Sequence, residues 1–307
     1  MYKEYFGFHE YPFSISPDPR FLYLTAMHQE ALAHLSYGAQ TDGCITLLTG
    51  EVGTGKTTIC RCFLENIDAS TEVAVILNPR LTARGLVAAI CDEFQIAPAL
   101  SRPTVKDYID CLNRFLLTIH ADNRQAILVI DEAQNLDLEV IEMVRMLTNL
   151  ETNTRKLLKI FLIAQSELAE QLTSPELRQI NQRVTSRYHL DGLNCDEVRT
   201  YIAHRVAVAG GGRAPLFSGG AITRICRLSR GIPRLINTLC DRALLGAYAQ
   251  EKERVNKAIV DRAAREVFGQ PVNRLAGVPF AAKPYVGLLL LLLLIAALSL
   301  TLPQTLF

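Results

Sequence analysis

The stretch at residues 50–58 has the residue types and spacing of a phosphate-binding loop. Its members are Gly50, Glu51, Val52, Gly53, Thr54, Gly55, Lys56, Thr57 and Thr58. The first eight follow the pattern G-x-x-x-x-G-K-[ST], in which glycines let the backbone curl so that N–H groups point at phosphate oxygens. The start of a following helix adds partial positive charge. Lys56 is expected to reach the β- and γ-phosphates and Thr57 to bind Mg²⁺, so the pattern predicts ATP and Mg²⁺ as cofactors.

Two adjacent carboxylates, Asp131 and Glu132, directly follow the apolar residues 126–130. Such a run is typical of a buried strand, and the carboxyl edge of a parallel sheet is where open α/β folds bind ligands. Asp131 is expected to hold Mg²⁺, directly or through water. Glu132 is expected to polarise the attacking water as a general base. Together with the loop, this pair indicates hydrolysis of a triphosphate.

Further polar and basic side chains are candidates for contact with the γ-phosphate or the attacking water. Gln165 follows the apolar residues 157–164, where its amide can orient water. A guanidinium stabilises charge on the γ-oxygens, either from its own chain or from a neighbouring subunit. The arginine candidates are Arg178, Arg183, Arg187 and Arg234. For each of these arginines the alternative is an ordinary surface charge.

The elements that must position these residues follow from apolar periodicity. Short apolar runs predict strands at 44–49, 72–77, 126–130, 157–164 and, more weakly, 184–190. Helices are predicted at 28–40, 58–67 and 104–120, and four more at 194–209, 218–230, 233–249 and 256–268. Strands that alternate with helices predict an α/β fold of the P-loop NTPase type: a parallel sheet of about five strands with helices on both faces. The last four helices predict a C-terminal helical lid.

Composition changes along the chain predict its domains and one transmembrane helix. The expected order is an irregular arm rich in aromatic residues and prolines (1–27), a nucleotide-binding core (28–191), the helical lid (192–268), a linker (269–284), a membrane span (285–302) and a short tail (303–307). The expected span has 18 residues without a charge. As a helix it would be roughly 27 Å long, close to the thickness of a hydrocarbon core. The alternative is a helix buried in the core of the protein. The N-terminus lacks the apolar stretch of a signal peptide.

Overall charge and cysteine usage exclude several classes of protein. The 307 residues are 49% hydrophobic and 21% charged, which excludes a mainly disordered chain. The 32 basic and 31 acidic residues nearly balance, but residues 1–173 carry 14 basic and 22 acidic side chains and the remainder 18 and 9. The basic half either meets phosphate, lipid head groups or the acidic half of another copy, or is simply a solvated surface. The eight cysteines form no C-x-x-C pair and are expected to be small buried residues in a reducing cytoplasm.

The ordered motifs resemble the AAA+ superfamily and, more narrowly, the general secretion pathway protein A or ExeA-type ATPases. The aromatic arm carries this resemblance at residues 5–8 (YFGF), 11–14 (YPFS) and 17–23 (PDPRFLY). Further matches are the strings DEAQ at 131–134, SPELR at 174–178, QRV at 182–184 and GIPRLIN at 231–237. The similarity covers roughly residues 2–268.

The resemblance implies an ATPase in which Gln165 is the sensor-1 residue and Arg234 the sensor-2 residue. It implies that Arg183, with Arg178 as second choice, is the finger supplied to a neighbouring subunit, so the chain is expected to form a homo-oligomer. Arg274 and Lys283 precede the expected span and no basic residue follows it, which predicts a single-pass bacterial inner-membrane protein with a cytoplasmic ATPase domain.

The implied cellular task is ATP-driven assembly of a secretion, pilus or polysaccharide export system, with a membrane-bound B-type partner or a secretin. One departure stands out, because ExeA-type proteins carry a periplasmic peptidoglycan-binding domain after the span and here only residues 303–307 follow. Two alternatives stay open: a DNA-associated AAA+ ATPase of the initiator or transposition type, and a nucleotide-binding scaffold with negligible turnover. Nucleic acid is not expected as a partner, since no helix-turn-helix or winged segment follows the lid.

Overall fold

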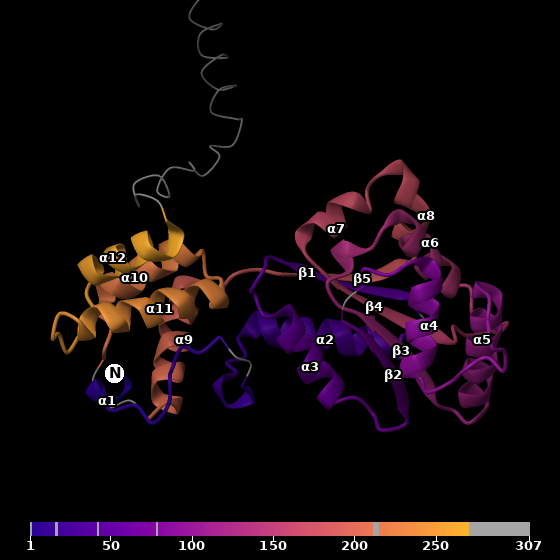
Figure 1. The fold of residues 1–307 in the computed structure, drawn as a ribbon, viewed down its shortest axis with the longest axis horizontal. Helices are drawn as coiled ribbons and strands as arrows, with labels where there is room; N and C mark the ends of the chain where they lie inside the picture. The colour runs from indigo at the N-terminus through magenta and orange to yellow at the C-terminus, as the bar shows by residue number, and fades with distance from the viewer. Residues whose placement is uncertain (1, 16–17, 42, 78, 211–214, 270–307) are drawn as a thin grey trace, which may run out of the picture.

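The computed structural model describes residues 2–15, 18–41, 43–77, 79–210 and 215–269. It has a part built around a sheet and an all-helical part, which lie side by side in Figure 1. The sheet has five strands: β1 (Ile45–Gly50), β2 (Thr71–Ile76), β3 (Gln125–Ile130), β4 (Leu158–Ala164) and β5 (Val184–Leu190). They pair in the order β2-β3-β4-β1-β5, and every pairing is parallel. The predicted parallel sheet is therefore confirmed, with strand ends within two residues of those expected.

Helices lie between the strands and continue after the last of them. Those associated with the sheet are α2 (Ala26–Gln40), α3 (Lys56–Glu65), α4 (Ala83–Glu93), α5 (Val105–Ala121), α6 (Leu138–Leu147), α7 (Ser166–Gln171) and α8 (Arg178–Asn181). Three single turns of 3₁₀ helix are η1 (Pro19–Phe21), η2 (Ala133–Asn135) and η3 (Pro175–Leu177). The all-helical part contains α9 (Cys195–Val208), α10 (Gly219–Ser229), α11 (Pro233–Tyr248) and α12 (Lys257–Phe268), which we call the lid helices.

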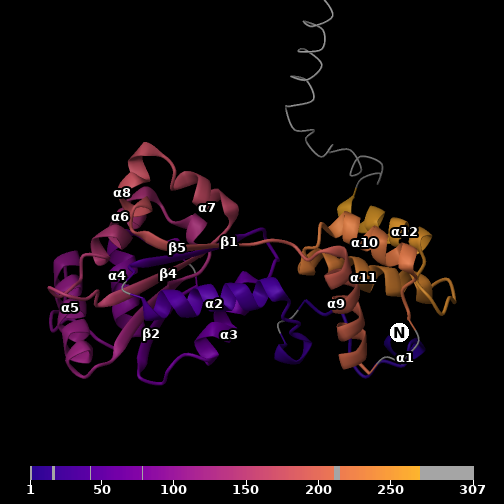
Figure 2. The same ribbon diagram turned by 180° about the vertical axis from the view of Figure 1, so that it is seen from behind.

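The sheet is buried on both faces, as its near-continuous apolar strands require. Successive side chains of a strand point to opposite faces, so Phe161 and Ile163 of β4 pack in one core and Ile160 and Leu162 in another. The first core is shared with α2 and α3, and the second with α4 to α8. Seen from the other side in Figure 2, α2 and α3 again lie together on one side of the sheet. The expectation of helices on both faces is confirmed.

Two helix starts illustrate how local sequence sets these boundaries. Thr104 caps α5, since its Oγ1 accepts from the backbone N–H of Asp107 while the Asp107 carboxylate accepts from the Thr104 N–H at 2.7 Å. Asn194 and Glu197 form the same reciprocal arrangement at the start of α9. Each capping box satisfies N–H groups that an uncapped helix leaves without partners.

The N-terminal arm packs on the lid helices. Tyr2, Phe8, Phe13 and Phe21 share one buried core with α9 to α12. Residues 2–5 form a short helix, α1 (Tyr2–Tyr5), and the turn η1 follows, so the expectation of a wholly irregular arm was wrong at these places. A short helix is possible there because Tyr2 buries its ring against the lid and its hydroxyl donates to Asp241.

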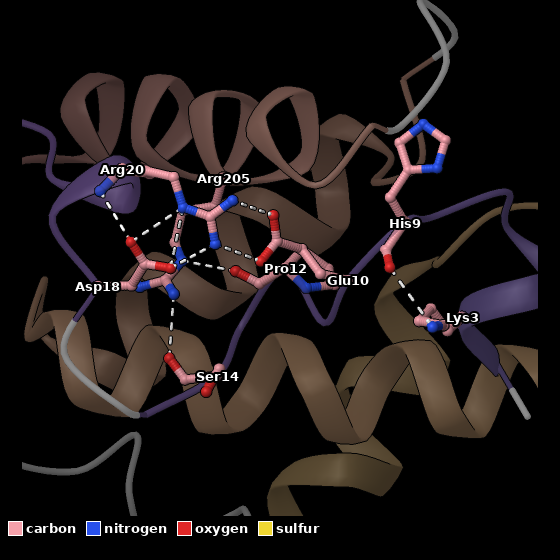
Figure 3. Close-up of polar contacts among 8 residues, drawn as sticks. All are labelled: Lys3, His9, Glu10, Pro12, Ser14, Asp18, Arg20 and Arg205. Carbon is pink, nitrogen blue, oxygen red and sulfur yellow. Dashed lines mark hydrogen bonds and ion pairs between the residues drawn. The ribbon is translucent and has the colours of Figure 1, made fainter.

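Arg205 of α9 holds the arm in place (Figure 3). Its guanidinium is buried and donates to the carbonyl oxygens of Pro12 at 2.6 Å and Ser14 at 3.0 Å. It also lies 4.7 Å from the centre of the Phe21 ring. Nearby, Arg20 pairs with Glu10 at 2.8 Å on the exposed surface, where such pairs contribute little to stability. The buried Arg205, together with the Tyr2 hydroxyl on Asp241, therefore fixes the arm to the lid helices by polar contacts.

One expectation about the cysteines was wrong. Cys195, at the start of α9, and Cys226, in the last turn of α10, form a disulfide with a Cα–Cα distance of 5.5 Å. The two residues are 31 positions apart, and only the packing of α9 against α10 brings them together, so spacing could not reveal the pair. Cys44, Cys60, Cys91 and Cys240 are free and buried as expected, whereas Cys62 and Cys111 are free and half-buried.

The expected membrane span at 285–302 lies outside the described residues, as do residues 270–284 of the linker and the tail at 303–307. None of the helices within the described ranges combines the length and apolar composition needed to cross a bilayer.

Candidate functional site

The strand order brings three chain segments to one edge of the sheet. β1 lies next to β4, and β4 lies next to β3, all running in the same direction. Their carboxyl ends therefore share an edge, where the phosphate-binding loop follows β1, Asp131 and Glu132 follow β3, and Gln165 follows β4. This is the edge at which open parallel sheets bind ligands.

The loop between β1 and α3 depends on its glycines. Gly53 and Gly55 have φ angles of +85° and +105°, in the left-handed region that favours glycine. Gly55 is the N-cap residue of α3, so Lys56 and Thr57 stand at the first turn of the helix. Thr54 is buried, and its hydroxyl donates to the carbonyl oxygen of Glu51 at 2.9 Å, closing the turn from within.

Lys56 points back across the loop. Its Nζ donates to the carbonyl oxygens of Gly50 at 2.8 Å and Glu51 at 2.9 Å, and its side chain is buried. Burial lowers the pKa of Lys56, and the negative charges of Glu132, Asp131 and Glu51 oppose that shift. The ammonium is thus held by neutral carbonyl partners, which a negatively charged phosphate oxygen can replace.

Thr57 and Asp131 meet at the sheet edge. The Thr57 hydroxyl donates to Asp131 Oδ2 at 2.8 Å, and the backbone N–H of Glu132 donates to Oδ1 at 2.8 Å. A hydroxyl beside a carboxylate offers the hard oxygen ligands that Mg²⁺ prefers while leaving its other positions to water and phosphate. These two residues therefore fit the expected metal. Within the described ranges, no three His, Cys, Asp or Glu residues cluster as a metal site of another type.

Glu132 is held by two amides. Its φ angle of +53° is uncommon outside glycine, and such strained residues cluster at functional sites. Gln134 Nε2 donates to Glu132 Oε2 at 2.5 Å, and Gln165 Nε2 donates to the same oxygen at 3.4 Å. Gln134 Oε1 in turn accepts from the backbone N–H of Gln165 at 3.0 Å. Both amides therefore contact the same oxygen of the Glu132 carboxylate, Oε2.

Gln134 was missed as a site residue by sequence reasoning, although it lies only two positions after Glu132. The string DEAQ at 131–134 carries a family resemblance, but its spacing alone does not indicate that Gln134 bridges β3 and β4. The available signal was an amide within one 3₁₀ turn, η2, of a candidate base.

The lid helices reach the loop through Arg234. Its backbone N–H donates to the carbonyl oxygen of Gly53 at 3.3 Å, and a Cβ added at Gly53 would lie 2.6 Å from the Cβ of Arg234. The Arg234 side chain is exposed beside the loop. Gly231, with φ of +76°, and Leu193 form the base of this contact, since the Leu193 N–H donates to the Gly231 carbonyl at 2.9 Å.

The other arginines lie away from this site. β5 runs parallel to β1 with Val184 opposite Ile45 and Leu190 opposite Gly50, so Arg183 is at the amino edge of the sheet. A strand of this length spans about 20 Å, too far for Arg183 to reach its own loop. Arg178 is exposed at the start of α8, and Arg187 donates to Asn181 Oδ1 at 2.6 Å. The structure therefore does not bring these three together with the loop of the same chain.

The remaining predicted loop residues have exposed side chains. Val52 and Thr58 are exposed. The Glu51 carboxylate accepts from Ser166 Oγ at 3.3 Å, which ties the loop to the start of α7. Ser166 is a second residue that sequence reasoning missed.

His28 of α2 is a third residue that sequence reasoning missed. Its ring is buried beside the loop, where Nε2 would lie 3.7 Å from a Cβ at Gly55, and it forms a hydrogen bond with the Thr54 backbone. Burial lowers the pKa of His28, and the hydrogen bond to Thr54 opposes that shift. A lone histidine in a predicted amphipathic helix carried no indication of this contact.

Comparison with known proteins agrees with this site. A sequence profile for the AAA domain matches residues 39–172. General secretion pathway protein A of Aeromonas hydrophila is 49% identical over 269 residues, which are 88% of this chain and 49% of that protein. The chain thus spans about half the length of this relative.

Solved structures share the fold at lower identity. The crystal structure of Cdc6p from Pyrobaculum aerophilum has a TM-score of 0.63 and 17% identity, covering 87% of this chain and 74% of that one. The structure of Drosophila ORC bound to DNA has a TM-score of 0.63 and 20% identity, covering 84% of this chain and 65% of that one. With the profile match and the 49% identity, the loop and paired carboxylates at one sheet edge establish that the chain belongs to the general secretion pathway protein A family of AAA+ ATPases.

Proposed function

We propose that the chain binds ATP with Mg²⁺ at the carboxyl edge of the sheet and hydrolyses it. The observation that carries this proposal is the direct contact between Thr57 and Asp131 at 2.8 Å, with Lys56 and Glu132 on either side. Two segments distant in sequence, the loop after β1 and the residues after β3, supply a phosphate ligand, two metal ligands and a base at one place. An arrangement of this kind suits phosphoryl transfer to water.

Each residue has a separate task in this proposal. Backbone N–H groups of the loop and the Lys56 ammonium bind the phosphates, while Thr57 and Asp131 would hold Mg²⁺. When bound, the metal would neutralise charge on the phosphate oxygens. Glu132 takes the proton of the attacking water, and the amides of Gln134 and Gln165 keep the carboxylate oriented.

The lid contributes through Arg234. Its backbone already contacts Gly53 and its side chain is exposed beside the loop, from where the guanidinium can turn toward a bound γ-phosphate. We propose that ATP draws the guanidinium inward and so fixes the lid helices against the loop. A guanidinium suits this task since its planar fork matches phosphate oxygens.

We further propose that the ATPase domain works on the cytoplasmic side of the bacterial inner membrane, anchored by residues 285–302 as a single span. In this role it would form homo-oligomers and support assembly of a secretion, pilus or polysaccharide export system with a membrane-bound B-type partner or a secretin. The support is the 49% identity to general secretion pathway protein A, a name that describes the relative, and the uncharged sequence of the span.

Phosphate release by the full chain in detergent or vesicles, measured with Mg²⁺ and ATP, tests the proposed activity. We expect turnover that requires both Mg²⁺ and ATP and a chain that is recovered with membranes. A titration with duplex DNA at several salt concentrations separates the alternative, since tight binding with a steep salt dependence would favour a DNA-associated ATPase. Nucleotide binding without phosphate release would instead indicate a scaffold.

The position of Arg183 at the amino edge leads to a prediction about subunits. If Arg183 acts on the site of a neighbouring copy, specific activity rises with protein concentration and Arg183→Ala lowers kcat by about a thousandfold, as loss of such a finger does elsewhere. Arg114→Ala, at an exposed position on α5, is the matched control and retains full activity.

Mixing two inactive variants makes this test sharper. Arg183→Ala retains its base, and Glu132→Gln retains its arginine, so a mixture contains interfaces at which both are present. Partial recovery of activity on mixing supports action between subunits. Concentration-independent activity together with an unimpaired Arg183→Ala variant would contradict it.

A further inference from the structure

His28 connects the first turn of α2 with the phosphate-binding loop. The N-cap of α2 is Thr25, the point at which the arm leaves the lid helices and enters the sheet-containing part. On one side of the His28 ring, Nδ1 lies 3.2 Å from the Thr25 backbone nitrogen and 2.9 Å from its Oγ1. On the other side, Nε2 faces the turn at Thr54 and Gly55. The ring therefore fills the space between a helix cap and the loop.

The contact with Thr25 determines which ring nitrogen carries the proton. A backbone N–H can only donate, so Nδ1 must accept the bond from the Thr25 nitrogen. In the neutral ring Nε2 then carries the hydrogen and is a donor. The loop group that it meets must be an acceptor, and the backbone acceptor at Thr54 is its carbonyl oxygen.

Holding that carbonyl has a consequence for the other side of the same peptide. The Thr54–Gly55 peptide is planar and trans, so its C=O and N–H point in opposite directions. With the Thr54 carbonyl turned toward His28, the Gly55 N–H points away from the His28 ring. Gly55 alone does not enforce this orientation, because a glycine adopts many backbone conformations.

We propose that His28 is a positioning residue that keeps the Thr54–Gly55 peptide in the orientation that presents the Gly55 N–H to a nucleotide phosphate. The inference rests on the proposed function, and it concerns the ground-state shape of the loop rather than the hydrolytic step. His28 touches no phosphate. It acts through the loop backbone, so its loss weakens nucleotide binding by freeing one peptide to rotate.

Two substitutions separate the contacts of the ring. An asparagine places its oxygen where Nδ1 lies, so His28→Asn retains the contact with Thr25 but loses the one with Thr54. A glutamine reaches as far as Nε2 with an N–H donor, so His28→Gln retains the loop contact and loses the cap. His34→Asn is the matched control, because His34 lies on the same helix against the Tyr188 ring and not against the loop.

Two quantities are measured for each variant of the full chain. One is the dissociation constant for binding of magnesium–ATP, by calorimetry, and the other is the melting temperature without nucleotide. We expect His28→Asn to weaken binding about five- to tenfold, the effect of one net hydrogen bond. We expect His28→Gln to bind within threefold of the unsubstituted chain although its melting temperature falls more than that of His28→Asn. A purely structural role would make affinity follow melting temperature in both variants.

Unchanged affinity in His28→Asn, or affinity losses that simply follow melting temperature, would overturn the inference while leaving the proposed function intact. If the unsubstituted chain bound no magnesium–ATP, the proposed function would fail and this inference with it. The two failures are therefore distinguished by the unsubstituted chain in the same experiment.

Discussion

Replacing Glu132 by glutamine is expected to lower kcat for ATP hydrolysis by at least a hundredfold while the dissociation constant for magnesium–ATP changes less than threefold. The amide is nearly isosteric with the carboxylate and can still accept from Gln134 through its oxygen. It cannot take a proton from water, and a positioned general base is worth about a hundredfold or more. Single-turnover phosphate release, with binding measured separately, resolves the two effects.

A control must remove the same charge near the loop without removing the base. Glu167 is suitable, since its carboxylate is exposed at the start of α7 and its charge acts on Lys56. Glu167→Gln is expected to keep kcat within threefold. Turnover of Glu132→Gln within tenfold of the unsubstituted chain, about 1.4 kcal/mol of barrier, would assign the base elsewhere.

The strands and the loop could be predicted from sequence because their causes are local. A strand buried on both faces must be apolar throughout, and a loop that directs N–H groups inward needs glycine at Gly53 and Gly55. The two carboxylates after β3 belong to the same class, since a short apolar run ending in acids is typical of a buried strand that ends at the sheet edge. These features were predicted at or within two residues of their positions.

The parts that sequence reasoning missed depend on contacts between distant segments. Gln134 became a site residue only because β4 lies beside β3, and His28 only because α2 passes the loop. The arm was recognised as aromatic, but its docking on α9 through the buried Arg205 has no local pattern. The disulfide between Cys195 and Cys226 is a further example, since two helices must pack before the thiols meet.

Replacing Lys56 by methionine is expected to weaken magnesium–ATP binding by about a hundredfold, since removing one partner of a buried charged contact costs roughly 3 kcal/mol. Methionine keeps the apolar stem in the buried position that Lys56 occupies. Without nucleotide, two effects oppose each other. The carbonyls of Gly50 and Glu51 lose their donor, but the desolvation of the ammonium, which lowers the pKa of Lys56, is relieved.

The melting temperature therefore separates binding from folding. The nucleotide-free variant is expected to melt close to the unsubstituted chain, whereas only the latter is stabilised by added magnesium–ATP, by about 2.7 kcal/mol at a ligand concentration one hundred times its dissociation constant. Lys106→Met, on the exposed side of α5, is the control and should respond to nucleotide as the unsubstituted chain does. Equal stabilisation of Lys56→Met by the nucleotide would mean that the ammonium is not a phosphate ligand, and the loop would then bind through its backbone alone.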